Sequence, residues 1–93
     1  MPEPNLFHLL IVSPDRIVLE TEAKRVFLPG PIQEIAVLPD HTPLYSELIK
    51  GVIRVETETD ELKEVDIEGG IVRVRQNQVS VILGFEADIE RPT

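Results

Sequence analysis

The sequence contains no cysteine and no tryptophan, and aromatic residues make up only 4% of its 93 residues. The lack of cysteine excludes disulfide bonds and thiolate metal sites, and it is compatible with a reducing compartment. The shortage of aromatic residues means that the core has to be built from Val, Ile and Leu, residue types that favour strands. A chain of this length supplies one hydrophobic core, so we expect residues 1–93 to form a single domain.

Basic residues are also scarce, because 9 Lys and Arg stand against 17 Asp and Glu and the formal net charge is −8. A negative charge of this size repels phosphate backbones and anionic lipid, so we expect no nucleic-acid partner. Long apolar runs are missing as well. The run from Leu9 to Val12 is too short for a signal sequence or a membrane span, and no basic region precedes it. We therefore expect no direct insertion into lipid.

Signatures of catalysis are absent too: the chain has no Gly-rich phosphate loop, no Gly-x-Ser-x-Gly motif and no Asp-x-Asp calcium loop. Its two histidines, His8 and His41, are far apart in sequence, so a metal site would need the fold to bring them to a carboxylate such as Glu34. Three acidic residues that share one side of an expected strand are typical of a solvated surface: Glu64, Asp66 and Glu68. We predict no catalytic residue, no metal site and no cofactor.

Short apolar runs and period-two alternation, bounded by Pro, Gly, Asn or Asp, recur along the whole chain, and no sustained helical stripe interrupts them. The pattern predicts strands at residues 6–12, 17–20, 23–28, 35–38, 44–49, 52–57, 62–68, 71–75 and 79–83. We expect an all-β fold of about ten short strands. They would pack as a β-sandwich of two mostly antiparallel sheets, because an open sheet of this width would leave one apolar face in water.

Alternation along the later strands assigns side chains to the two sides of each strand. Apolar residues are expected to point inward at Ile53, Val55, Val65, Ile67, Val72, Val74, Val79, Val81 and Leu83. Charged residues are expected to point to water at Arg54, Glu56, Glu64, Asp66, Arg73 and Arg75.

Turn residues separate the expected strands. The segment 13–16 suits a type I turn with Pro14 at its second position. Tight hairpin loops are expected at 59–60 and 76–77, where Asp60 and Asn77 tolerate positive φ. Gly69 and Gly70 indicate a bend or a place where another backbone comes close.

The most informative stretch runs from Glu34 to Leu44, where Pro39 and Pro43 hold a polar Asp-His-Thr turn between two apolar segments. A rigid polar loop of this kind suits recognition of a partner. A proline-stiffened connection with an exposed histidine is an equally good reading of the same residues.

This stretch is similar to the loop of ATP synthase epsilon subunits, whose usual form is Gly-Glu-apolar-Gly-apolar-apolar-Pro-Gly-His-Ala-Pro-Leu. Five residues match it in order: Glu34, Pro39, His41, Pro43 and Leu44. Further similarities lie at 11–16, 26–30, 51, 69–71, 74 and 77–81, so the resemblance covers nearly the whole chain. The family tends to carry glycine where this chain has Gln33, Ala36 and Asp40, and alanine where it has Thr42, so the loop geometry could differ.

The resemblance implies a non-catalytic part of the F1 central stalk that binds the gamma subunit and the c-ring. Ion-driven rotation of the ring would then reach the alpha/beta head. Glu34 and His41 would contact the polar loops of the c-ring. Leu38, Leu44 and Leu48 would serve the gamma contact, and packing in the core is an equally good reading of each of these leucines. The implied place is the cytoplasmic face of the inner membrane, as a peripheral part of the ATP synthase complex.

Many family members continue into a C-terminal helical hairpin that restrains ATP hydrolysis, whereas this sequence ends at Thr93. The resemblance is therefore to the N-terminal β-sandwich domain in a short form. For such a form we expect neither inhibition by helix insertion nor the nucleotide site of some longer relatives.

Two other classes of function remain open at this point. A free-standing β-sandwich module that binds a carbohydrate or a protein would fit the same pattern, although sugar platforms usually need exposed aromatic rings and only Tyr45 and three Phe are present. A small barrel enzyme would use His41 and Glu34 as metal ligands or as an acid–base pair.

Overall fold

The computed structural model describes residues 5–84, and these form eight strands and no helix. In chain order they are β1 (Phe7–Ser13), β2 (Arg16–Pro29), β3 (Glu34–Val37), β4 (Leu44–Leu48), β5 (Gly51–Thr57), β6 (Leu62–Ile67), β7 (Gly70–Arg75) and β8 (Gln78–Leu83). The expected all-β class is confirmed. Among residues 5–84 there are eight strands where nine segments were expected, because the segments at 17–20 and 23–28 join into the single strand β2.

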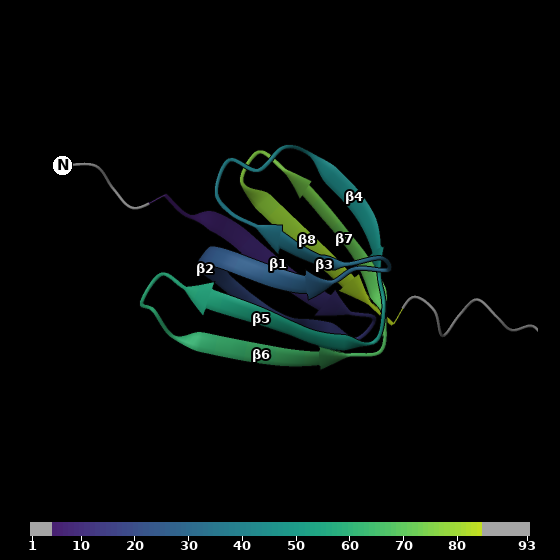
Figure 1. Ribbon diagram of the computed structural model, residues 1–93. Coiled ribbons are helices and arrows are strands. Elements are labelled where there is room, and N and C mark those ends of the chain that lie inside the picture. The colour runs from purple at the N-terminus through teal and green to yellow at the C-terminus, as the bar shows by residue number, and fades with distance from the viewer. Residues whose placement is uncertain (1–4, 85–93) are drawn as a thin grey trace, which may run out of the picture.

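The strands belong to one continuous hydrogen-bonded network in the order β4-β7-β8-β1-β2-β5-β6, with β3 paired to β2. Every pairing is antiparallel except that of β1 with β8. The sheet curls so that β3, β5 and β6 lie across from β4, β7 and β8 (Figure 1). The expected sandwich is therefore present, with its two layers joined through β2 instead of separated into independent sheets.

Strand β2 joins the layers because its two halves have different partners. Residues 16–23 pair with β1, residues 26–29 pair with β3, and residues between Ala23 and Phe27 pair with β5. The register shifts between Ala23 and Arg25, which marks a bulge. An extra residue in a strand exchanges the sides of the following side chains, so the buried positions change from Ala23 to Val26 and Leu28. The sequence pattern breaks at this point although the strand continues.

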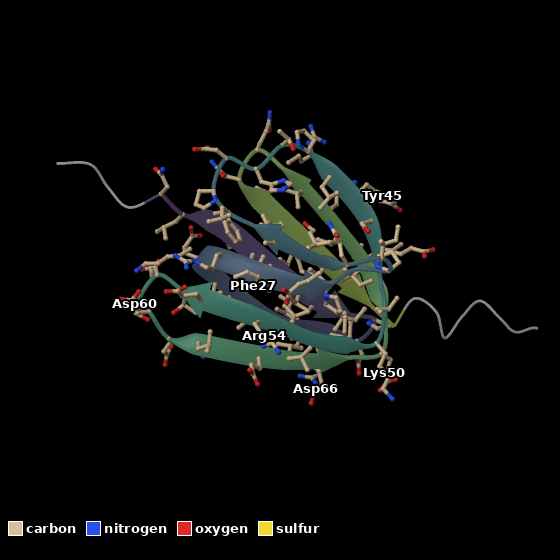
Figure 2. The ribbon with its side chains drawn as sticks, viewed as in Figure 1. Phe27, Tyr45, Lys50, Arg54, Asp60 and Asp66 are labelled. Atoms are coloured by element: carbon tan, nitrogen blue, oxygen red, sulfur yellow. The ribbon has the colours of Figure 1, made fainter. Side chains whose placement is uncertain are left out.

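The hydrophobic core lies between the layers and consists of aliphatic side chains with one phenylalanine. Its buried members are Phe7, Leu9, Ile11, Ala23, Val26, Leu28, Val37, Leu48, Ile53, Val55, Ile67, Val72, Val74, Val79 and Val81. The inward assignments made by alternation are confirmed, with Val65 and Leu83 partly buried against this core. Charged side chains such as Arg54 and Asp66 extend away from it (Figure 2).

Two connections between strands depend on the conformation or the small size of particular residues. Gln76 and Asn77 both have positive φ, 54° and 59°, as a two-residue type I′ hairpin turn between β7 and β8 requires. At Gly70, a Cβ atom would lie 2.5 Å from the carbonyl oxygen of Ile82 on the neighbouring strand β8. The expectation of a close backbone approach at this glycine pair is thus confirmed.

Candidate functional site

The segment between β3 and β4 forms a tight turn rather than a loose loop. The amide of His41 donates a hydrogen bond to the carbonyl oxygen of Leu38, 3.2 Å away. Pro39 occupies the second position of this turn and Asp40 the third, where its φ is 63°. Proline followed by a residue with positive φ fits a type II turn. Asp40 therefore adopts the positive φ of a position at which the family that this loop resembles usually has glycine.

The unusual conformation of Asp40 is stabilised from the β7–β8 turn. The amide nitrogen of Asp40 donates to Asn77 Oδ1 at 2.6 Å, and Asn77 Nδ2 donates to Asp40 Oδ1 at 3.0 Å. The carbonyl oxygen of Asn77 also accepts a hydrogen bond from the amide of His8 at the start of β1. We call the reciprocal pair Asp40–Asn77 the clasp. It ties two connections that are 37 residues apart in sequence.

His41 is half-buried within this turn and contacts its own backbone. Its Nδ1 lies 2.6 Å from the carbonyl oxygen of Thr42. Because a carbonyl oxygen can only accept, Nδ1 carries the proton and donates it. The second ring nitrogen, Nε2, is then an acceptor when the ring is neutral and a donor when the ring is charged.

Glu34 is exposed at the start of β3, where it is paired with Pro29 of β2. Its Oε2 accepts from Arg54 Nη1 at 3.4 Å, and the same guanidinium has its Nε 3.7 Å from Glu64 on β6. Arg54 thus bridges two carboxylates across three strands. Such exposed ion pairs hold a side chain weakly, so Glu34 remains available to another basic group.

Glu34 begins β3, whereas His41 lies four residues beyond the end of this strand. Glu34 interacts with Arg54, whereas His41 interacts with its own turn. Within residues 5–84, no group of three or more His, Asp or Glu side chains is arranged to hold a metal ion. The geometry therefore gives no support to a joint acid–base pair or metal site made by these two residues.

The three leucines expected at a partner surface have different environments. Leu48 is only 4% exposed and belongs to the core. Leu44 packs against the core from β4. Leu38 is 50% exposed at the entrance to the turn. Of the three, Leu38 has the most side-chain surface for a partner, while Leu44 and Leu48 have clear roles in packing.

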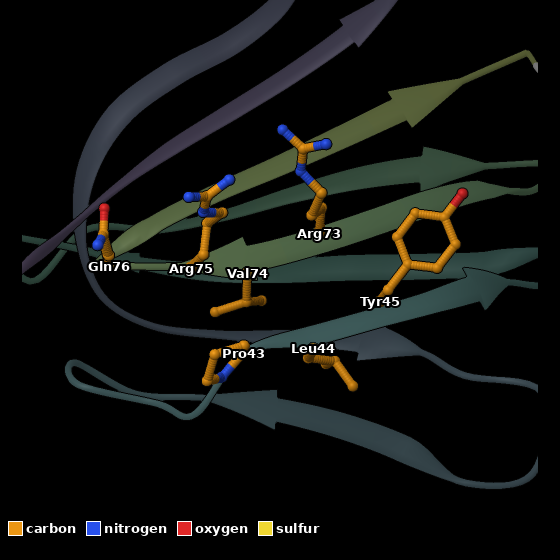
Figure 3. Close-up of a pocket in the computed structure, with 7 residues that line it drawn as sticks. All are labelled: Pro43, Leu44, Tyr45, Arg73, Val74, Arg75 and Gln76. Carbon is orange, nitrogen blue, oxygen red and sulfur yellow. The ribbon is translucent and has the colours of Figure 1, made fainter.

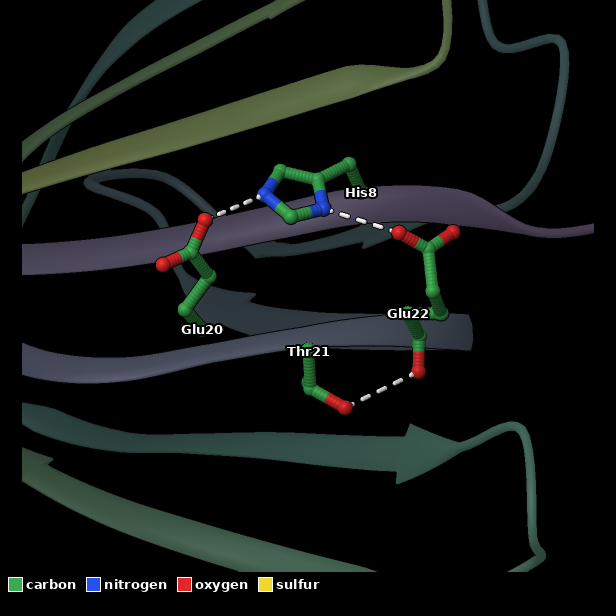
Figure 4. A network of polar contacts seen from close by, with 4 residues as sticks. All are labelled: His8, Glu20, Thr21 and Glu22. Carbon is green, nitrogen blue, oxygen red and sulfur yellow. Dashed lines mark hydrogen bonds and ion pairs between the residues drawn. The ribbon is translucent and has the colours of Figure 1, made fainter.

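A second polar cluster, centred on His8, was not expected from the sequence (Figure 4). His8 Nδ1 lies 2.8 Å from Glu22 Oε2, and its Nε2 lies 2.8 Å from Glu20 Oε2. The hydrogen bonds to Glu22 and then Glu20 raise the pKa of His8 above its usual value, since both favour the charged imidazolium. A bulge between Ile11 and Val12 decides this pairing, because a regular two-residue hairpin would place Thr21 opposite His8.

A shallow pocket of about 490 Å³ lies beside β4 and β7 (Figure 3). Tyr45, Arg73 and Arg75 extend from the solvent side of these strands, whereas Val74 points to the core side. Alternation correctly predicted that both arginines face water. It gave no sign that Tyr45, which pairs with Arg73 across the two strands, would stand beside them.

Comparison with known proteins gives one consistent family. Residues 6–84 match the family described as "ATP synthase, Delta/Epsilon chain, beta-sandwich domain". The ATP synthase epsilon chains of two Desulfitobacterium hafniense strains, Y51 and DSM 10664 / DCB-2, are each 39% identical to this chain over 90 residues. Each alignment covers 91% of this chain and 67% of the relative.

Two solved structures share the fold. A chain of the Euglena gracilis mitochondrial ATP synthase, from a structure of OSCP, F1 and the c-ring, has a TM-score of 0.81 at 21% identity. The likeness covers 89% of this chain and 53% of that one. A chain from the central stalk and c-ring of the Tetrahymena thermophila mitochondrial ATP synthase has a TM-score of 0.71 at 15% identity, over 90% of this chain and 72% of that one.

Proposed function

Since the chain belongs to the ATP synthase delta/epsilon chain family through its β-sandwich domain, we propose that it binds the gamma subunit and the c-ring in the central stalk. In this role it transmits ion-driven rotation of the ring toward the alpha/beta head. The observation that carries the proposal is the family match over residues 6–84, which includes the turn with His41 and the position of Glu34.

The epsilon chain is a non-catalytic part of ATP synthase, and the complex to which it belongs is associated with a membrane. Among the described residues, no helix is long and apolar enough to cross a membrane. We propose that the chain is held at the cytoplasmic face of the inner membrane by its protein partners.

The turn between β3 and β4 supports a contact with the c-ring because it combines rigidity with free polar groups. Pro39, Pro43 and the clasp fix its backbone, while His41 Nε2 can accept or donate. On binding, Glu34 would give up its weak ion pair with Arg54 and form an ion pair with a basic group on the ring. Leu38 would contribute apolar contact to gamma, with smaller contributions from Leu44 and Leu48 because these two pack in the core.

The test is co-expression with the gamma subunit of the same genome, followed by size-exclusion chromatography with and without the isolated c-ring. Glu34→Ala and His41→Ala are each expected to weaken ring binding while gamma still co-elutes. Matched controls are Glu64→Ala, which removes the other partner of Arg54, and His8→Ala, which removes the second histidine.

Co-elution of the unchanged chain with gamma is the expected result. A chain that never co-elutes with gamma under native conditions would overturn the stalk assignment, and a free-standing binding module would become the better explanation. If ring binding is unchanged in both alanine variants, the ring contact does not lie at Glu34 and His41.

A further inference from the structure

Two arginines stand side by side on the solvent side of β7. Arg73 and Arg75 are separated by one residue, so their side chains leave the same side of the strand about 6.5–7 Å apart. Val74, between them, points into the core. Both guanidinium groups extend from the solvent side, and the amide of Gln76 lies at the end of the row (Figure 3). Two positive charges this close repel each other, so an anion placed between them would be bound favourably.

Strand β8 adds two neutral hydrogen-bonding groups to this pair of charges. Ser80 lies opposite Arg73 in the antiparallel register, and residues directly opposite each other share one side of the sheet. Gln78 lies opposite Arg75 in the same way. These four side chains and Gln76 line a pocket of about 280 Å³, which we call the Arg73 pocket. Its volume is that of about nine water molecules at ~30 Å³ each, so a small oxyanion fits inside.

Acidic side chains of the described part of the chain do not neutralise the Arg73 pocket. Among residues 5–84, neither arginine has a carboxylate within ion-pair distance. Glu47 faces the same side of β4, but it lies opposite Ile71 and not opposite an arginine. Asp40, which meets the turn after β7, is hydrogen-bonded to Asn77. The two positive charges are therefore available to a ligand.

On the other side of the pocket, His8 stands between it and two glutamates of β2. His8 lies beside Gln78 in the parallel register of β1 and β8. Its two ring nitrogens lie 2.8 Å from Glu22 Oε2 and 2.8 Å from Glu20 Oε2. These carboxylates are thus bound to His8 and lie one strand beyond it. In a chain with a formal net charge of −8, the Arg73 pocket is a local positive region that attracts an anion at short range.

We propose that the Arg73 pocket is an oxyanion site that binds a phosphate group, either free or carried as an ester on a small molecule. A guanidinium presents a planar fork of N–H groups that matches two oxygens of a phosphate. Charge-assisted hydrogen bonds of this kind are about 2.7–2.9 Å long, so two arginines about 6.5–7 Å apart can hold one tetrahedral group from both sides. The Gln78 amide and the Ser80 hydroxyl can donate to its remaining oxygens.

The number of donors favours a phosphate over a carboxylate. A carboxylate has two oxygens, and the fork of a single arginine satisfies both. The second arginine and the neutral donors of β8 would then have no acceptor. A phosphate ester offers three acceptor oxygens and a charge of about −1.5 to −2, which matches two guanidinium groups and the donors opposite them.

The experiment titrates the isotope-labelled chain with sodium phosphate at constant ionic strength and follows its backbone amide signals by NMR. The expected result is a saturable change centred on residues 73–80. Arg73→Gln and Arg75→Gln are each expected to weaken binding about tenfold, because each removes hydrogen bonds between charged groups. The matched control is Arg54→Gln, which removes an equal charge from an exposed arginine on the other layer. This control is expected to bind phosphate as the unchanged chain does, and circular dichroism checks that every variant is folded.

A second titration with glycerol phosphate distinguishes the two sources of the phosphate group. Equal affinities show that the free ion is sufficient, whereas about tenfold tighter binding of the ester identifies an ester as the ligand. A response that sodium chloride reproduces at the same ionic strength would overturn the site. Unweakened binding in both pocket variants would overturn it too, as would binding by Arg54→Gln as weak as that of Arg73→Gln. The site uses side chains of β7 and β8 and the turn between them, so none of these results decides the stalk function.

Discussion

Replacing Asn77 with glycine should loosen the turn between β3 and β4 without disturbing the β7–β8 turn. Glycine adopts the φ of 59° found at this position without strain, so the change removes only the two side-chain hydrogen bonds of the clasp. Each such bond contributes about 0.5–1.5 kcal/mol net, and the clasp is exposed to water. We expect the free energy of unfolding to fall by about 1–2 kcal/mol. Urea unfolding followed by circular dichroism measures it.

Two further variants separate the hydrogen bonds from backbone strain. Asn77→Ala should cost about 1–2 kcal/mol more than Asn77→Gly, because an L side chain is strained at positive φ. Asp40→Gly keeps the φ of 63° available and removes the acceptor of Asn77 Nδ2. The double variant Asp40→Gly/Asn77→Gly should therefore cost about 0.5 kcal/mol less than the two single changes together. Costs that add to within about 0.3 kcal/mol would refute the coupling that the clasp implies.

Three other predictions concern His8, the core and one close backbone approach. Because its two glutamates raise the pKa of His8, the ion pairs should stabilise the fold fully below about pH 6.5 and lose this effect as the pH rises through the higher folded-state pKa. Urea unfolding at pH 6 and at pH 8.5 measures this effect in the variant His8→Gln. The substitution should lower the free energy of unfolding mainly at pH 6, by under about 1 kcal/mol at this exposed site. An equal loss of stability at the two pH values would contradict the prediction. Ile53→Ala, in the core, should cost about 2–5 kcal/mol, while the exposed Leu62→Ala stays within about 0.5 kcal/mol in the same assay. Gly70→Ala should cost about 1–3 kcal/mol because the added methyl group meets the backbone of Ile82, and an unchanged thermal midpoint would show that β8 shifts freely.

Much of the fold could be predicted because its signals are local. The alternation of Ile53, Arg54 and Val55 fixes which side of β5 is buried, since successive side chains of a strand point to opposite sides. The hairpin between β7 and β8 follows from Asn77, a residue that tolerates positive φ. Turn chemistry and period-two patterning depend only on neighbours in the chain, so they can be read without knowing the rest of the fold.

Strand β2 could not be predicted as one strand because its continuity depends on partners distant in sequence. The bulge near Ala23 interrupts the pattern, and β1, β3 and β5 supply the pairing that carries the strand through it. The same limit applies to the candidate site. The loop motif from Glu34 to Leu44 indicated the turn that contains His41. The hydrogen bonds between Asn77 and Asp40 appear only when two connections distant in sequence meet in space.

The sequence by itself determined the all-β class, the aliphatic core, most strand positions and, through the order of its motifs, the family. These properties depend on residue type, short-range periodicity and spacing along the chain. Only the tertiary structure decided that one curled network joins the layers, that His8 meets Glu20 and Glu22, and that the exposed Tyr45 stands beside Arg73 across β4 and β7. Those outcomes depend on bulges and strand registers, because a shift of one residue changes which side chains share a face.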